Sequence, residues 1–462
     1  MTPYPSLALV IGVTAGLMAC SPTEGAAADA NRVDTTAVAD AGASADTDRA
    51  MDAPVAPEVA DVADSGGTDA VGDGSFAADG QDVQGLDADT FEVELPPPPP
   101  PVFDNAPQWF YQTKIEGIEL DADGESEQLK ITLPDGTSSV FVLLESDDDF
   151  HFLNLKTVVT PKPELESIIV GAGNGTCIPC RNRVSAGQKV GSFLIPNDPA
   201  ITSVKGGQWR FTIRGTTIIK TVFETTYPVW PGFVDMTVLA RTEPIPDKGR
   251  LVLHLHFTGA GDLTASEAPT DPRLQEALIQ VAAIFGGAGI EVEVAGYHDV
   301  PGTAEDPTLL NLESTLGAPN DLGKLLLTGQ SDDTAALNVF FVESIYKDDD
   351  FSGGGIVLGI AAGIPGPAFL GPNYRGGVAI ASIDFMSDND YWGNVIAHEI
   401  GHFLGLYHST EKSGAVHDTL DDTDNDDPKN LMYWAYSPEQ LVISEDQATV
   451  MRSHPLVLPI AP

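Results

Sequence analysis

The eleven residues from His398 to His408, HEIGHFLGLYH, constrain the fold of this chain more than any other segment. On a helix, residues four apart lie on one face, so His398 and His402 can direct a ring nitrogen at the same point. Gly405 can adopt the positive φ that ends a helix, which lets the chain bend and bring His408 back. The pattern therefore predicts a helix, a glycine bend and three imidazoles that converge.

Three converging imidazoles are a donor set that Zn²⁺ takes in catalytic sites, where a fourth position stays open. Glu399 follows the first histidine and is predicted to be a base, not a ligand, because it can accept a proton from a metal-activated water. The alternative is a buried amphipathic helix whose histidines only form hydrogen bonds. A bare H-E-x-x-H is a weak signal, but five fixed positions in eleven are specific.

This pattern resembles the extended motif H-E-x-x-H-x-x-G-x-x-H of the metzincin zinc peptidases, which continue to a methionine-containing turn beneath the metal. Met432, in the segment NLMYW, is the candidate for that turn, with an ordinary core position as the alternative. The resemblance covers roughly residues 370 to 455. It implies a mixed α/β peptidase domain, a Zn²⁺ cofactor and a protein or peptide substrate.

Two branches of the metzincins are similar to this chain in different ways. Ser409, directly after the third histidine, resembles the matrixins, although the interval to Met432 is much longer than theirs. The segment HDTLDDT at 417–423, together with Asn430, is more similar to the pappalysins. Trp434 stands where many pappalysins and astacins place a tyrosine, while Tyr433 and Tyr436 are nearby.

The N-terminus resembles a bacterial lipoprotein signal over residues 1–20. An apolar run from Leu7 to Leu17 is too short to span a bilayer and leads into the sequence LMAC, which ends at Cys20. Cleavage before Cys20 and lipidation of that cysteine are expected, with an ordinary secretory signal or a cysteine without function as the alternatives. Ser21 favours the outer membrane by the same resemblance. We expect an exported protein, either an outer-membrane lipoprotein or extracellular, that touches membrane only through the N-terminal lipid.

Residues 21–101 are predicted to form a disordered tether. The segment is dominated by Ala, Asp, Gly, Thr and Val and ends in six prolines, Pro96 to Pro101. Such a composition buries too little apolar surface to offset its ordering entropy, and the prolines form a stiff spacer.

The whole chain has a net charge of -45, with 23 basic against 68 acidic residues, which disfavours nucleic acid as a partner.

Residues 102–243 are predicted to form a β-sandwich, similar to a jelly roll, because short alternating apolar stretches are separated by glycine and proline turns. The clearest stretches are 129–133, 139–144, 209–213 and 216–222. Cys177 and Cys180 are expected to form a disulfide, since an exported protein favours one and no second C-x-x-C is present for zinc. A redox motif, or a thiolate that caps the metal in a latent form, remains an alternative.

Residues 244–462 are predicted to form the metzincin-like catalytic domain, so that the chain is an α+β multidomain protein. Strands are expected at 250–257, 290–294 and 336–342, with helices at 272–285 and 394–404. The strand at 376–382 is expected either at the sheet edge, where a substrate could pair with it, or inside the sheet. The loop 353–372 is expected near the cleft.

The acidic run 421–427 does not fit an EF-hand, because Asp427 stands where the loop needs glycine and Tyr433 where it needs glutamate. The run, and Asp348 to Asp350, could coordinate Ca²⁺ in an irregular site, and the alternative is a solvated acidic loop.

The prediction for the whole chain is a zinc-dependent endopeptidase, tethered at the bacterial surface or released. The alternative is a non-catalytic adhesion or binding lipoprotein whose β-sandwich carries the function.

Overall fold

The computed structural model describes the backbone of 18–20, residue 103, and residues 106–460 with gaps. The gaps are 148–150, 163–164, 174, 179, 201–203, 218, 221–224, 303–307, 313–319, 330–334, 347–356 and 382–391. The predicted signal and tether therefore lie outside the described residues, apart from Met18–Cys20, and so do Asp348 to Asp350. Within the described part, no helix is both long enough and apolar enough to cross a membrane.

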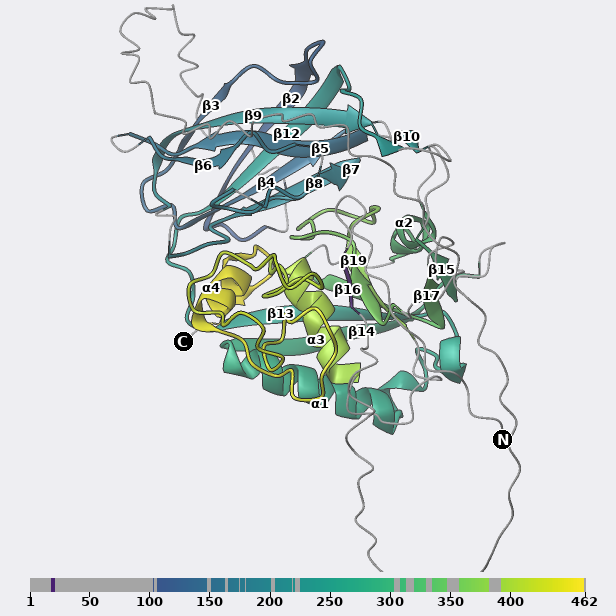
Figure 1. Ribbon diagram of the computed structural model, residues 1–462. Helices are drawn as coiled ribbons and strands as arrows, with labels where there is room; N and C mark the ends of the chain where they lie inside the picture. Colours follow the sequence, from purple (N-terminus) through teal and green to yellow (C-terminus); the bar gives the residue numbers. More distant parts are fainter. Residues whose placement is uncertain are drawn as a thin grey trace, which may run out of the picture. The chain divides into compact units, whose positions relative to one another are not determined.

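The first folded region consists of two antiparallel sheets (Figure 1). The first sheet has the order β2-β12-β4-β8, and the second has the order β3-β9-β5-β6 with β7 beside β5. The bounds are β2 Phe110–Leu120, β3 Leu129–Leu133, β4 Ser139–Glu145, β5 His151–Val159, β6 Ser167–Val170, β7 Gly187–Gln188, β8 Val190–Ile195, β9 Gly207–Thr217 and β12 Gly232–Arg241. The short antiparallel pair of β10 Ile219–Lys220 and β11 Thr225–Thr226 lies between β9 and β12 in the sequence.

Residue alternation explains how these sheets pack. Along β9, Trp209, Phe211 and Ile213 are buried while the residues between them are partly exposed, so that one face enters the core. Strand β4 is different, because both of its faces are buried: Val140 and Val142 belong to the core between the two sheets, and Phe141 and Leu143 to the neighbouring core. The first sheet is therefore covered on both sides.

The second folded region is built on a mixed sheet of order β1-β18-β19-β16-β13-β14, with β20 paired to β13. Strands β19, β16, β13 and β14 run parallel to one another, whereas β18 is antiparallel to β19 and β20 is antiparallel to β13. The bounds are β1 Met18–Cys20, β13 Gly249–Phe257, β14 Ile290–Asp299, β16 Leu337–Val342, β18 Gly359–Ala361, β19 Gly377–Ala381 and β20 Leu458–Pro459. A small separate pair joins β15 Leu309–Asn311 to β17 Ser344–Tyr346.

The strand expected at 376–382 is an interior strand. It is β19, which lies between β16 and β18. The antiparallel strand β18 comes from the segment 353–372, which the sequence predicted to be a loop. Its outer edge is paired with the backbone of Met18–Cys20, two residues of which would be removed by the predicted signal cleavage.

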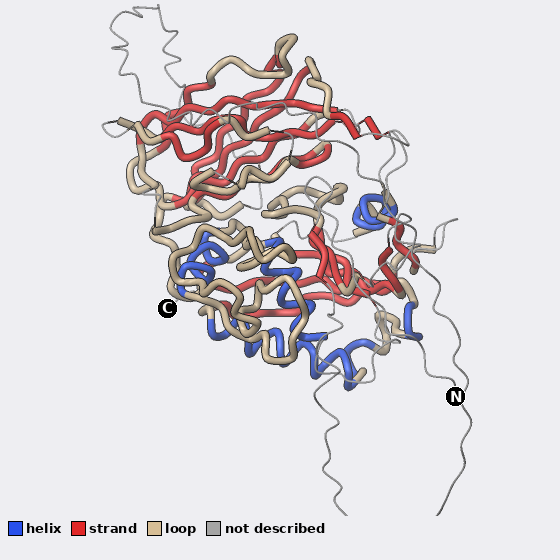
Figure 2. Tube along the Cα trace, viewed as in Figure 1, coloured by secondary structure: helices blue, strands red, loops and turns tan. Residues whose placement is uncertain are grey.

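Helices cover the sheet (Figure 2). Helix α1, Pro272–Gly287, begins at Asp271, whose carboxylate accepts from the backbone N–H groups of Arg273 and Leu274, each at 3.0 Å. It buries residues at helical spacing against α3, Trp392–Phe403, which lies beside it. The remaining helices are α2 Asp321–Leu326, α4 Glu445–Ser453 and the 3₁₀ turns η1 Ala260–Asp262 and η2 Ala268–Thr270. The described molecule is a β-rich, multidomain protein with few helices.

Candidate metal centre

Helix α3 and the bend after it bring three histidines together. Every residue of α3 is buried, and the helix ends at Phe403. Gly405 has φ of 110°, a left-handed conformation that glycine adopts readily. Its N–H donates to the carbonyl of His402 at 2.9 Å, and the N–H of Leu406 donates to Gly401 at 3.0 Å, so the chain turns back beneath the helix. The structure thus places a bend at the glycine that the sequence singled out.

The ring nitrogens converge at this bend. Nε2 of His398 lies 3.0 Å from Nε2 of His402, which lies 3.2 Å from Nε2 of His408. All three side chains are buried. Within the described residues, these histidines form the group whose nitrogens approach closely enough to share an ion, all within 4.8 Å of one another.

The opposite nitrogen of each ring has an acceptor. Nδ1 of His398 lies 2.6 Å from the carbonyl of Leu431, and Nδ1 of His402 lies 2.7 Å from that of Leu406. Nδ1 of His408 lies 3.0 Å from Oε2 of Glu411. A carbonyl or carboxylate oxygen only accepts, so each neutral ring carries its proton on Nδ1 and presents a lone pair at Nε2.

Three lone pairs that face one another repel unless a cation lies between them. This donor set therefore fits a divalent ion that prefers imidazole, and Zn²⁺ is the ion for which three histidines with an open position are typical. Burial, with a smaller contribution from the neighbouring imidazoles, lowers the pKa of His398 to about 3 and holds the pKa of His402 well below its ordinary value. Both rings are neutral near pH 7, as metal ligands must be.

Met432 packs against helix α3 at Gly401. It is fully buried, and a Cβ added to Gly401 would meet its sulfur at 2.8 Å. Gly401 sits between the two helical histidines, so only a residue without a side chain lets the methionine approach there. The turn is fastened by the N–H of Met432, which donates to Oδ1 of Asn430 at 2.8 Å, and by its carbonyl, which accepts from Ser409 at 2.9 Å.

The side chain of Glu399 packs against strand β18. Its side chain is buried, and a Cβ added to Gly359 would meet its Cγ at 2.6 Å and its Oε1 at 2.9 Å. The side chain thus lies against the backbone of β18. Glu399 follows His398 directly in the sequence, so this potential base lies between the helix that carries two of the histidines and strand β18.

Sequence reasoning missed Glu411 and Gly359. Burial alone would raise the pKa of Glu411, but His408 lowers it below the ordinary value, so the carboxylate is ionised near neutral pH. A carboxylate three residues after the last histidine was visible in the sequence, yet only the fold shows that it reaches Nδ1. No local signal identifies Gly359, because its role depends on β18 lying beside α3.

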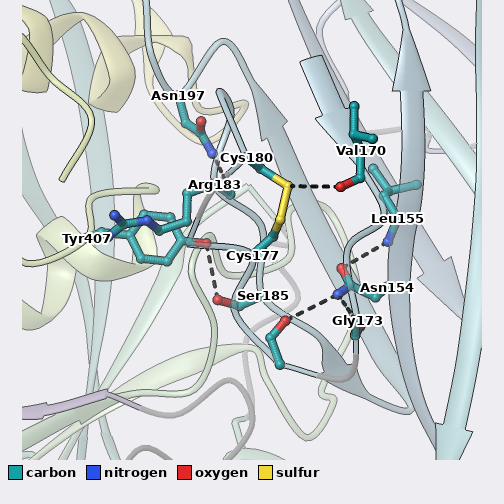
Figure 3. Close-up of a disulfide and its surroundings, with 11 residues drawn as sticks. Asn154, Leu155, Val170, Gly173, Cys177, Cys180, Arg183, Ser185, Asn197 and Tyr407 are labelled. Atoms are coloured by element: carbon teal, nitrogen blue, oxygen red, sulfur yellow. Dashed lines mark hydrogen bonds between the residues drawn. A yellow bond between two sulfur atoms is a disulfide. The ribbon is translucent and has the colours of Figure 1, made fainter. Parts of the chain in front are cut away.

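The other predicted residues lie as follows. Cys177 and Cys180 are joined by a disulfide (Figure 3). The backbone of Cys20 ends strand β1, and its side chain is outside the described part. In the acidic run, Asp422 accepts from the hydroxyl of Ser444 at 2.7 Å and from the N–H of Asp446 at 2.9 Å. This carboxylate therefore stabilises the start of α4.

Tyr433 and Tyr436 line a small pocket together with Asn394, Val395, His398 and Gln440. Its volume is about 10 Å³, which corresponds to no more than one water molecule. The two tyrosines thus lie close to His398, on the segment that follows Met432. Trp434 is not among the lining residues.

No protein-family model matches the chain, and no curated protein does. Among solved structures, metalloproteinase-II from Bacteroides fragilis is similar at 14% identity over 49% of this chain and 71% of that chain, with a TM-score of 0.25. A family two carbohydrate esterase from Cellvibrio japonicus is similar at 12% identity over 53% and 70% of the chains, with a TM-score of 0.12. These scores are too low to assign a fold or a family, so the interpretation of the site rests on its own geometry.

Proposed function

We propose that the chain is a zinc-dependent endopeptidase of the metzincin type, in a branch similar to the pappalysins or matrixins. The observation that carries the proposal is the set of three Nε2 lone pairs, each fixed by an acceptor at Nδ1. The left-handed Gly405 and the methionine beneath Gly401 support the metzincin type.

His398, His402 and His408 would hold the ion. Bound there, Zn²⁺ would polarise a water molecule and the carbonyl of the scissile peptide. Glu399 then accepts the proton that the attacking water loses and delivers it to the leaving amine. Because its side chain is buried against β18, Glu399 has little freedom to turn, which supports a base held in one orientation.

A peptide substrate is supported by strand β18. Its outer edge pairs with an extended segment, the backbone of Met18–Cys20, in antiparallel register. Cleavage of the predicted signal before Cys20 would leave this edge open for another extended chain, whose amides would pair with it beside Glu399. We further propose that the mature protein is exported, with a lipid on Cys20 and the acidic tether 21–101 between the membrane and the folded regions.

The test is metal analysis of the purified protein combined with cleavage of a peptide library. We expect one zinc per chain, cleavage that a chelator abolishes, and recovery when Zn²⁺ is added back. The Glu399→Gln variant should keep its zinc and lose proteolysis, since the amide cannot accept the proton. Equal cleavage by wild type and variant would refute the mechanism, and a purified protein without bound metal would refute the zinc site.

A further inference from the structure

The residue before the third histidine is held by the β-sandwich. The Tyr407 hydroxyl lies 3.1 Å from Oγ of Ser185 and 3.3 Å from the carbonyl of Ile364, to which it donates, so it accepts from Ser185. The guanidinium of Arg183 lies over the Tyr407 ring, 5.2 Å from its centroid (Figure 3). Tyr407 is 6% exposed and Arg183 is 4% exposed, so these contacts are shielded from water.

Arg183 also contacts the segment at His417, which packs on the residues that follow His408. Its Nη2 donates to the carbonyl of His417. The His417 ring in turn lies 3.0 Å from the hydroxyl of Thr410, and the N–H of Asp418 donates to the carbonyl of Ser409. One side chain of the sandwich thus contacts both the segment that precedes His408 and the segment that packs on the residues after it.

The loop that presents these side chains is itself fixed. The disulfide Cys177–Cys180 constrains its first residues, and the N–H of Cys177 donates to the carbonyl of Val184 at 2.7 Å, which closes the loop. The hydroxyl of Ser185 lies 2.8 Å from that of Thr176. Asn197 donates to the carbonyl of Arg183 through its side-chain amide. Residues 183–185 are therefore fixed in place by contacts with their neighbours in the sandwich.

The two folded regions also share an apolar core around this loop. Leu194 of the sandwich and Leu404 and Leu406 of the bend belong to one buried cluster, and Cβ of a residue at Gly405 would lie 3.2 Å from Leu194. The hydroxyl of Ser192 donates to the carbonyl of Pro365 at 2.6 Å. A cavity of only about 10 Å³ remains between Arg183, Tyr407 and their neighbours, room for at most one water molecule.

We infer that Arg183 and Ser185 of the β-sandwich are positioning residues for the metal centre, acting on His408 through Tyr407. The inference rests on the proposed zinc function. His398 and His402 are aligned by the helix that carries them, whereas His408 lies beyond the helix, where the chain must be ordered by other contacts. The sandwich supplies those contacts, so it is part of the metal centre and not a detachable spacer.

The test is the Zn²⁺ dissociation constant of the full chain, measured by competition with a chromogenic chelator. Arg183→Met and Ser185→Ala should each weaken zinc binding, by about tenfold for Arg183→Met, at the lower end of the effect of losing an orienting partner of a ligand. Arg181→Met is the matched control: Arg181 lies on the same loop, is 55% exposed and pairs with Glu166, so its zinc affinity should be unchanged.

Unchanged zinc affinity in both Arg183→Met and Ser185→Ala, even with a lower melting temperature, would overturn the inference and leave the loop a purely structural role. If Arg183→Met fails to fold, a double-mutant cycle of Ser185→Ala and Tyr407→Phe decides. Both variants remove the Ser185–Tyr407 hydrogen bond, so the loss of zinc affinity in the double variant should be smaller than the sum of the two single losses, and full additivity would contradict the inference. Failure of the proposed function is seen separately, as a wild-type chain that binds no zinc.

Discussion

Glu411 accepts a hydrogen bond from Nδ1 of His408 at 3.0 Å, whereas Nδ1 of each helical histidine is paired with a backbone carbonyl. His408 is therefore the histidine of the three whose orientation and tautomer are set by a side chain. A single substitution can change this partner without altering the helix. The other two partners, the carbonyls of Leu431 and Leu406, belong to the methionine turn and to the bend.

Glu411→Gln should weaken zinc binding by roughly tenfold to a hundredfold, because a neutral amide accepts a weaker hydrogen bond and no longer raises the basicity of the ligand. The measurement is zinc competition with a chelator at neutral pH. Glu439→Gln is the control, since the Glu439 side chain is 71% exposed in its contact with Lys429. Equal affinity in the Glu411→Gln variant and the wild type would show that Glu411 does not orient His408.

Gly359→Ala should lower kcat by on the order of a hundredfold with zinc retained, because the new methyl group would displace the carboxylate of Glu399. The Cβ would approach Oε1 of Glu399 to 2.9 Å and Cγ to 2.6 Å, and both the strand and the helix are packed. Steady-state peptide cleavage and metal content together check this. Gly371→Ala, where a Cβ meets nothing within 4 Å, should leave both unchanged. Normal kcat in Gly359→Ala would mean that the position of Glu399 is not set by β18.

Gly401→Ala should destabilise the protein by about 1–3 kcal/mol, although alanine is the better helix former. The added Cβ would lie 2.8 Å from the sulfur of Met432, which is fully buried. Gly286→Ala in α1 is the matched control, because its Cβ meets nothing within 4 Å, and it should stabilise by about 0.5–1 kcal/mol. Urea denaturation of both variants measures the difference. A stabilised Gly401→Ala variant would show that the methionine is not packed against the helix.

The convergence of the three histidines could be predicted from sequence because its geometry is local. His398 and His402 share a helix face by spacing alone, and Gly405 marks the bend, for which the structure has φ of 110°. The β-sandwich strands and α1 were equally visible, since alternation and the Asp271-Pro272 start are local signals. The helix from 272 and the strands at 129–133 and 139–144 are confirmed to within a few residues.

The contacts between distant segments could not be predicted. Strand β18 was read as loop because Gly359–Ala361 is too short and too glycine-rich for a strand signal, and only its pairing with β19 makes it one. Strand β4 has both faces buried, but a run of apolar residues does not say what covers its second face. The contact of Arg183 with Tyr407 joins residues that are far apart in sequence and carry no shared pattern.

A cluster of imidazoles on β13 and β14 gives the fold a dependence on pH that is separate from the metal ligands. His256 is 1% exposed and its Nε2 lies 2.9 Å from Oδ1 of Asn338. His298 stacks on it with ring centroids 5.0 Å apart, and His254 lies 2.8 Å from His298, Nδ1 to Nε2. Burial, together with the charges of the nearby His298 and His254, lowers the pKa of His256 to about 4, although the hydrogen bond that its Nε2 donates to Oδ1 of Asn338 acts to raise the pKa.

This shift should weaken the fold in acid. Because the folded pKa of His256 lies below the unfolded value of 6.5, its contribution to stability is complete above pH 6.5 and is lost as the pH falls towards 4. The free energy of unfolding should fall by up to about 1.4 kcal/mol per pH unit for this one proton. His256→Gln keeps a polar group for Asn338 without a titrating ring, so its stability should fall less steeply. Urea denaturation at pH 7.5 and 5 measures how the free energy of unfolding changes with pH in the wild type and in His256→Gln. The three histidines of the candidate metal centre are present in both proteins, so they do not contribute to the difference between the two slopes. Parallel slopes would mean that His256 does not titrate differently in the folded and unfolded states.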